Sequence, residues 1–429
     1  MTTPLRLVLL ALVTASPGRA GELVAGIELG GKGVKGTVVE YDPAKPGDVT
    51  LKDSATISTA LADLDGGRFK PANIARSADA VRTLVKRFGD KYGIPAANVV
   101  VAGSSGIVGT NRDELSAAVM KVTGKPLVFI TAAEEVGLTI QGLGLRKFPT
   151  PANVDIGGGN TKGGYYPNGD GKRLVSFAGI PGTVALTTKA KAAGGDYPTA
   201  VAKLADELVT EPLKAVATRD TKWKDQPKIF LTGGSVWAAA TLLHPAKVGD
   251  PLVPLTRQDA EAFLAMVSKD PTAFPAVDLS GIAAPSLRAA AEAELKKVRA
   301  VYPPESLLAG AHILARLFRT LPLDDTPTAF ARSGGTAWIL AYALAESDAA
   351  APAAPKPVAP PPQVSAPAMP YSPFPPPVFA FPQVSSPAPI QYAPPVWIAP
   401  APVMIGGPCP PTYGPRLRVG LSERLRMRR

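Results

Sequence analysis

Two segments of this 429-residue chain each place an acidic residue at the end of an apolar run and follow it directly with glycines. They read Val24-Ala-Gly-Ile-Glu-Leu-Gly-Gly-Lys-Gly33 and Asn153-Val-Asp-Ile-Gly-Gly-Gly-Asn-Thr-Lys162. Glycines let consecutive backbone N–H groups turn toward one anion, and a neighbouring carboxylate can hold a cation or orient a water. Either loop alone is equally compatible with an ordinary hairpin turn. The repeated design restricts the fold to one that builds this strand and turn twice.

The rest of the chain alternates between apolar runs and segments with helical spacing, in the same order in both halves. In the first half we expect strands at 23–27, 36–40, 99–102 and 127–130, and helices at 73–89 and 112–123. In the second half we expect strands at 152–156, 163–166, 174–178 and 229–231, and helices at 197–217 and 258–268. This layout predicts an α/β fold with an internal duplication.

Further segments lie between and after the two loops. Asn98-Val-Val-Val-Ala-Gly-Ser-Ser-Gly-Ile107 and the pair Glu134-Glu135 come between them, and Ile229-Phe-Leu-Thr-Gly-Gly-Ser235 comes after. This succession resembles the exopolyphosphatase and guanosine-pentaphosphate phosphatase (Ppx/GppA) family, a branch of the actin, sugar-kinase and Hsp70 ATPase superfamily. The resemblance covers residues 22–347.

The resemblance implies two RNase H-like (actin-like ATPase) domains with an interdomain cleft. The first would span residues 22–145 and the second residues 146–347, with its last helix returning to the first domain. The expected ligand is polyphosphate or another phosphorylated small molecule. A homodimer is compatible with this reading.

The resemblance also implies roles for individual residues. Glu135 would activate or position the attacking water, because cleavage of a phosphoanhydride depends on in-line placement and neutralised phosphoryl oxygens. Glu28 and Asp155 would hold Mg²⁺ or its water shell. The expected phosphate-binding residues come from both loops: Gly30, Gly31, Lys32, Gly157, Gly158, Gly159, Asn160, Thr161 and Lys162. Glu134 and Glu135 equally suit the first turn of a helix, where the dipole favours carboxylates, and both roles can coexist.

Three departures from the family pattern bear on this site. The first loop has Glu28 and Lys32-Gly33 where the family has aspartate and an Asn-Ser pair, and Lys162 replaces a glutamate. The segment that ends at Ile107 lacks the family's arginine. Lysines in place of polar and acidic groups should make the site attract anions more and depend less on metal.

The two ends of the chain differ from the rest. Arg6 and the short apolar run 7–15 predict a signal peptide over residues 1–20, and therefore export to the periplasm or cell envelope. About half of the 47 prolines fall in a stretch of 348–415 that we expect to be a disordered tail. The aromatics of that tail suit an envelope partner, and a passive spacer is the alternative. Residues 416–429 are basic, but no nucleic-acid motif accompanies them, so we expect no specific nucleic acid.

Three classes of function fit these features, and we give the favoured class first. The first is an exported hydrolase of exopolyphosphatase type, and the second is a non-catalytic polyphosphate or phospho-ligand binding protein on the same fold. The third is an actin-like ATPase, which would need adenine recognition near Gly233-Gly234 and residence in the cytosol, since we expect little nucleotide in the envelope. Two histidines and the single Cys409 argue against a His or Cys metal site.

Overall fold

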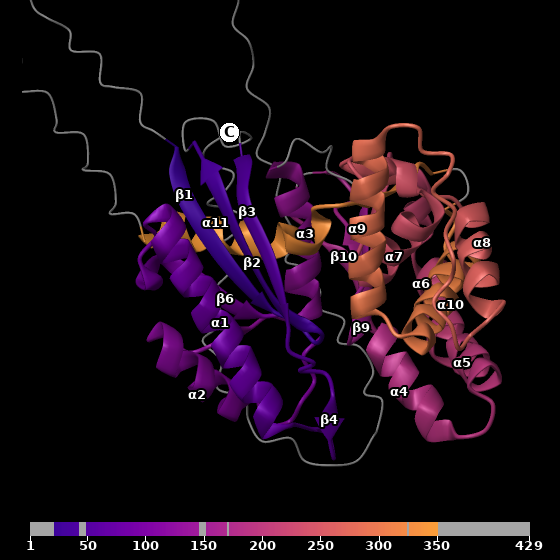
Figure 1. Ribbon diagram of the computed structural model, residues 1–429, viewed down its shortest axis with the longest axis horizontal. Coiled ribbons are helices and arrows are strands. Elements are labelled where there is room, and N and C mark those ends of the chain that lie inside the picture. The colour runs from indigo at the N-terminus through magenta and orange to yellow at the C-terminus, as the bar shows by residue number, and fades with distance from the viewer. Residues whose placement is uncertain (1–20, 43–48, 146–151, 170, 324–325, 351–429) are drawn as a thin grey trace, which may run out of the picture. The chain divides into compact units, whose positions relative to one another are not determined.

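The computed structural model describes residues 21–42, 49–145, 152–169, 171–323 and 326–350. The predicted signal peptide and basic C-terminus, and the predicted tail from residue 351 onward, lie outside these residues. Within the described residues, no helix is both long and apolar enough to cross a membrane. The described chain folds as an α/β protein, as the sequence predicts (Figure 1).

The first sheet has five strands in the order β3-β2-β1-β6-β7. β1, β2 and β3 form an antiparallel meander, and β6 and β7 continue the sheet parallel to β1. The strands are β1 (Glu22–Leu29), β2 (Gly33–Tyr41), β3 (Val49–Ser58), β6 (Val99–Gly103) and β7 (Val128–Phe129). A two-stranded ribbon of β4 (Leu64–Asp65) and β5 (Arg68–Phe69) follows the meander.

Helices cover both faces of the first sheet because side chains along β1 alternate in direction. Ala25 and Ile27 join the core under α1 (Pro71–Tyr92) and α2 (Arg112–Thr123). Val24 and Gly26 face the other way, toward α11 (Ala337–Ala350), which also packs along α3 (Ala132–Leu145). The last described helix of the chain therefore completes the core of the first sheet (Figure 1).

The second sheet has six strands in the order β10-β9-β8-β11-β13-β12. Its first five positions repeat the first sheet, with an antiparallel meander of three strands followed by two parallel strands. β12 adds an antiparallel edge. The strands are β8 (Ala152–Ile156), β9 (Asn160–Tyr165), β10 (Val175–Pro181), β11 (Ile229–Thr232), β12 (Leu252–Pro254) and β13 (Thr328–Ala331). The duplication expected from the sequence is present in the strand order.

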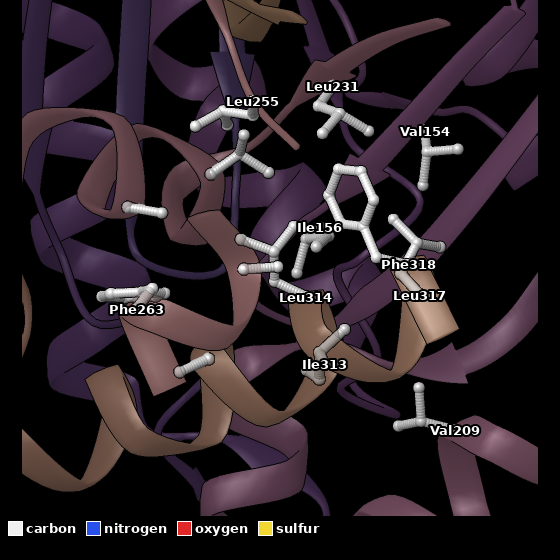
Figure 2. Packing of buried hydrophobic residues seen from close by; sticks show 14 of the residues in the cluster. Val154, Ile156, Val209, Leu231, Leu255, Phe263, Ile313, Leu314, Leu317 and Phe318 are labelled. Carbon is white, nitrogen blue, oxygen red and sulfur yellow. The ribbon is translucent and has the colours of Figure 1, made fainter. Parts of the chain in front are cut away.

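The core of the second sheet is built around α10 (Pro304–Thr320), which is buried over most of its length. Figure 2 shows Leu314 and Phe318 of this helix gathered with Val154 and Leu231 of the central strands. Residues 306–318 of this helix are all buried, including Ser306, His312 and Arg316, so the helix lies inside the protein. The surrounding helices are α4 (Thr183–Ala193), α5 (Tyr197–Ala205), α6 (Glu211–Arg219), α7 (Gly234–Leu243), α8 (Arg257–Ser268) and α9 (Pro285–Val301).

The elements expected from the sequence are found close to their predicted bounds. α2 and β8 match theirs residue for residue. The helix expected at 197–217 consists of α5 and α6 joined by a π-helical turn, Asp206–Thr210. α11 continues to Ala350, past residue 347, where we expected the globular part to end.

Candidate functional site

The two glycine loops are hairpin turns with the same residue plan. The amide of Gly30 donates to the carbonyl of Gly33 at 2.9 Å, and the amide of Gly157 donates to the carbonyl of Asn160 at 3.0 Å. Across each hairpin the acidic residue faces a lysine seven positions later. The first loop thus pairs Glu28 with Lys35, and the second pairs Asp155 with Lys162.

Lys162 is the most enclosed charge of the site, with a side chain only 3% exposed. Its Nζ lies 2.7 Å from Oδ2 of Asp155, 3.1 Å from Oε1 of Glu135 and 3.2 Å from Oδ1 of Asn160. An ammonium has three donors, so these three oxygens saturate it. Burial lowers the pKa of Lys162, but the two carboxylates outweigh burial and leave that pKa above its usual value.

The remaining oxygens of the two carboxylates also accept hydrogen bonds from the protein. Oδ1 of Asp155 accepts from the Thr232 hydroxyl at 3.0 Å, and Oε2 of Glu135 accepts from the Ser105 amide at 2.8 Å. Burial raises the pKa of Asp155, yet the charge and hydrogen bond of Lys162 outweigh it and hold that pKa below its usual value. Both carboxylates are therefore fixed in place by bonds to each of their oxygens.

The pair in the first loop is held more loosely. Nζ of Lys35 lies 3.4 Å from each oxygen of Glu28, and the Lys35 side chain is 36% exposed whereas Glu28 is buried. Burial raises the pKa of Glu28; Lys35 counteracts this, while the nearby Glu135 and Asp155 raise it further. The effects of Glu135 and Asp155 on Glu28 indicate that the three predicted carboxylates lie near one another.

Lys32 connects the two loops. Its stem lies beside Gly158, because a Cβ on that glycine would be 3.6 Å from Cγ of Lys32. Its ammonium lies 3.3 Å from the centre of the Tyr302 ring, a cation–π geometry. Nζ is buried and has no hydrogen-bond acceptor among the described residues, although the stem is partly exposed. Burial lowers the pKa of Lys32 to about 7.

The predicted phosphate-binding residues fall into two groups in the structure. The Thr161 hydroxyl donates to the Pro181 carbonyl at 3.0 Å, and the Asn160 amide donates to the Ser105 hydroxyl at 3.0 Å. Together with Lys162 and the amides of Gly30 and Gly157, these groups are committed to the protein. The donors that have no acceptor within the described part of the chain are the amides of Gly31, Gly158 and Gly159 and the ammonium of Lys32.

The two glutamates at the start of α3 have separate roles. Oε2 of Glu134 accepts from the amide and hydroxyl of Thr131, whose hydroxyl accepts from the Glu134 amide in return. This reciprocal pair is a capping box, and Glu134 is exposed. Glu135 is buried at the site. The capping role and the site role left open by the sequence thus belong to different residues of the pair.

The loop after β6 meets the second glycine loop through its backbone. A Cβ on Gly159 would lie 2.0 Å from the carbonyl oxygen of Gly106, so only glycine fits there. This close approach places the Ser105 amide against Glu135. Ser105, Thr232 and Tyr302 were not among the predicted site residues. The first two stand in segments that the sequence singled out, directly beside glycines.

The residues around Asp155 do not fit the expected Mg²⁺ ion. Within the described residues, no group of three or more His, Cys, Asp or Glu side chains is placed to hold a metal. The Lys162 ammonium, 2.7 Å from Asp155, would also repel a cation bound there. At a separation of about 4 Å that repulsion is about 4 kcal/mol per unit of charge near a protein surface. Asp155 therefore lacks the open oxygens that a divalent ion requires.

A scan against protein-family models gives no match, and neither does a search of curated protein sequences. Solved structures do match. The Ppx/GppA protein of Aquifex aeolicus is similar with a TM-score of 0.54 and 18% identity, over 76% of this chain and 98% of that one. An exopolyphosphatase from Cytophaga hutchinsonii is similar with a TM-score of 0.53 and 12% identity, over 72% and 94% of the two chains.

These matches establish the fold of the chain. The chain is an α/β protein whose two sheets share one strand order. Its fold is that of the Ppx/GppA structures, which it matches over nearly their whole length. The resemblance drawn from the sequence motifs is confirmed at the level of the fold.

Proposed function

We propose that this chain is a phosphoanhydride hydrolase of exopolyphosphatase type, acting on inorganic polyphosphate or a related phosphorylated ligand. The observation that carries the proposal is the placement of Glu135. Its buried carboxylate is held by the Ser105 amide and by Lys162, beside glycine amides and an ammonium that have no acceptor among the described residues. The fold shared with an exopolyphosphatase supports it.

In this proposal the two sheets belong to two RNase H-like domains, and the ligand enters the cleft between their glycine loops. Phosphoryl oxygens accept hydrogen bonds from the amides of Gly31, Gly158 and Gly159 and from the ammonium of Lys32. Such donors stabilise the charge on the phosphoryl group as it transfers. Lys35, the more exposed of the paired lysines, adds positive charge at the same entrance.

The hydrolytic step follows from the position of Glu135. Its carboxylate accepts a hydrogen bond from a water molecule and orients the water oxygen toward the terminal phosphorus, in line with the bridging oxygen. The new P–O bond forms as the bridging P–O bond breaks, and the shortened chain leaves with the electron pair on its oxygen. The water proton passes to Glu135 and then to solvent, and inorganic phosphate is released.

A second candidate is a protein that binds polyphosphate without cleaving it. The observation that favours it is the complete pairing of the carboxylates, since all four oxygens of Glu135 and Asp155 already accept hydrogen bonds. Both candidates use the same ligand and the same glycine amides.

One pair of variants separates the candidates, in protein that lacks residues 1–20. We expect Glu135→Gln to abolish phosphate release from long-chain polyphosphate while it leaves polyphosphate binding in place. Glu134→Gln is the matched control, because it changes the adjacent glutamate and affects only the helix cap. Binding without release in the unmodified protein would favour the second candidate, and the absence of both would reject the two together.

The proposal also includes export. It rests on the pattern of Arg6 and the apolar run 7–15, and it suits a polyphosphate ligand better than a nucleotide. We expect the mature protein to begin after Ala20. Mass spectrometry of the protein from its native cells tests this, and an intact Met1 would reject it. The tail that follows residue 350 is proposed to contact an envelope partner.

A further inference from the structure

We infer that this site operates without a divalent cation, because the ammonium of Lys162 takes the place between Asp155 and Glu135 that a metal ion would need. The inference rests on the proposed function only for the identity of the ligand. Its structural basis is the set of contacts around one side chain, which holds whatever the ligand is.

The Lys162 ammonium cannot leave this place easily. Lys162 lies on β9 directly opposite Asp155 on β8, so the sheet itself holds the lysine in register. Its three hydrogens serve Asp155, Glu135 and Asn160, and its side chain is buried. Moving it would leave the buried Glu135 and the mostly buried Asp155, 16% exposed, without a counter-charge, which is strongly unfavourable. A metal ion would therefore compete with a cation that belongs to the fold.

The charges of the site are also largely offset without a metal. The carboxylates of Glu135 and Asp155 act on Glu28, so the three acids lie close enough to interact. Two lysines are bonded to them, Lys162 to Asp155 and Glu135, and Lys35 to Glu28. With these groups ionised, three negative and two positive charges leave the set with a net charge of minus one. A divalent ion would reverse that charge, and it would find each oxygen of Asp155 already bonded.

The donors that the protein leaves unpaired suit a polyanion that carries no bound metal. The donors left for it are the Lys32 ammonium and the amides of Gly31, Gly158 and Gly159. These groups offer hydrogen bonds and a single movable positive charge. They bind phosphoryl oxygens directly. In this inference the positive charge that other phosphoryl-transfer sites obtain from bound magnesium comes from the Lys32 ammonium.

The first experiment measures metal binding without any ligand. Free Mn²⁺ is followed by electron paramagnetic resonance as unmodified protein, Lys162→Glu or Lys121→Glu is added. Lys121→Glu is the matched control, because it makes the same charge change at an exposed position on α2. We expect no Mn²⁺ site in the unmodified protein or the control. Lys162→Glu frees Asp155 and adds a third carboxylate. It should bind Mn²⁺ at least about tenfold more tightly than any weak binding seen with the unmodified protein.

The second experiment keeps the inference testable if Lys162→Glu fails to fold. Polyphosphate binding and phosphate release by the unmodified protein are measured in EDTA and in Mg²⁺. We expect binding in EDTA to be no weaker, and release to differ by less than about twofold. Mn²⁺ binding to the unmodified protein that Asp155→Asn removes, or loss of polyphosphate binding in EDTA, would overturn the inference. Absence of release under both conditions would reject the proposed hydrolase instead, and the Mn²⁺ titration would still decide about the metal.

Discussion

The two glycine loops have the same order of acid, glycines and lysine, but their paired lysines differ in burial and in the closeness of their contacts. In the second loop Lys162 is 2.7 Å from Asp155 and 3% exposed. In the first loop Lys35 is 3.4 Å from Glu28 and 36% exposed. The difference comes from outside the hairpins, because Glu135 and Asn160 add two acceptors to Lys162. The lysine of the second loop is held by its neighbours, whereas the lysine of the first loop is accessible to solvent.

The residue at the third position of each glycine loop also differs in its contacts between the two copies. Lys32 in the first loop corresponds to Gly159 in the second, four residues after the acid. Gly159 lies against the Gly106 backbone and leaves no room for a side chain. Lys32 instead extends to the second loop and leaves its ammonium without an acceptor among the described residues. At this position the second copy of the hairpin has a glycine packed against the backbone, and the first copy has an ammonium without a hydrogen-bond acceptor among the described residues.

This comparison changes the role that we expected for Lys162. The sequence predicted that it would bind a phosphate oxygen directly, in the place of a family glutamate. The structure gives its ammonium three acceptors within the protein, so the ligand-binding role passes to Lys32 and Lys35 in our proposal. The prediction that the site depends less on metal does not require the direct contact, and it is the subject of the experiments with Mn²⁺ and EDTA.

The largest expected effect comes from removing the locked lysine. Lys162→Met should lower the free energy of unfolding by about 3 to 5 kcal/mol, because it leaves the buried Glu135 and the partly buried Asp155 without a counter-charge. Urea denaturation at pH 7 measures the loss. The loss should shrink as the pH falls toward the range where carboxylates protonate. A loss below about 1 kcal/mol at pH 7 would mean that Lys162 is not a structural cation.

Removing the Lys32 ammonium, which has no acceptor among the described residues, should raise the free energy of unfolding. The pKa of Lys32 falls to about 7 on folding, so the unfolded chain binds the proton more tightly between pH 7 and the ordinary range near 10.5. Below pH 7 the folded protein carries the full cost of the buried charge, and above about pH 10.5 it carries none. Wild-type stability relative to Lys32→Met should therefore rise with pH across this window.

The size of this effect is limited by water that reaches the partly exposed Lys32 stem. We expect Lys32→Met to stabilise the protein by about 2 to 4 kcal/mol at pH 6, less than the unscreened shift implies. Urea denaturation at pH 6, 8 and 10 measures it. The same variant should bind polyphosphate more weakly, and wild-type affinity should fall as the pH rises through 7. A gain in stability that is independent of pH would show that hydrophobic packing, not the charge, causes it.

Neighbouring glycines of the second loop provide the next test. Gly159→Ala should destabilise the protein by about 1 to 3 kcal/mol, because its Cβ would overlap the Gly106 carbonyl and push the Ser105 loop away from Glu135. Gly158→Ala is the matched control, since its Cβ would only touch Lys32 and Val184 at ordinary distances. Thermal unfolding of both variants compares them. Equal melting temperatures would indicate that the two loops do not approach as closely as described.

Much of the fold could be predicted because local signals were strong. α2 begins after Asn111 and ends at Gly124, which has the left-handed φ of 72° typical of a helix C-terminus. β3 was missed because its sequence is largely polar and exposed. It pairs with β2, and its buried Asp53 bonds to Arg87 of α1. Such pairing depends on residues distant in the chain, which no local pattern reveals.

The candidate site shows the same limit. Glu28, Glu135, Asp155 and Lys162 were named from the motifs, and the structure brings them into one cluster. The sequence could not identify Thr232 as a neighbour of Asp155 or Tyr302 as a neighbour of Lys32, because those contacts join segments far apart in the chain. Nor could it show that Lys162 is shared by Asp155 and Glu135. Residue type and spacing predicted the chemistry, whereas the choice of partners required the folded backbone.

The smallest expected effect on stability is that of replacing Lys35, which pairs with Glu28 in the first loop. Lys35→Met should change the free energy of unfolding by less than about 1 kcal/mol, because Lys35 is partly exposed and its 3.4 Å contacts with Glu28 are long. Its effect on the ligand should be larger, since a solvent-accessible ammonium beside the first glycine loop attracts polyanions. We expect weaker polyphosphate binding and a shallower dependence of affinity on salt. Urea denaturation and binding titrations at two salt concentrations, with Lys121→Met as the control, measure both. If Lys35→Met destabilised the protein as much as Lys162→Met, the two hairpins would be equally structural and the division of roles between them would be wrong.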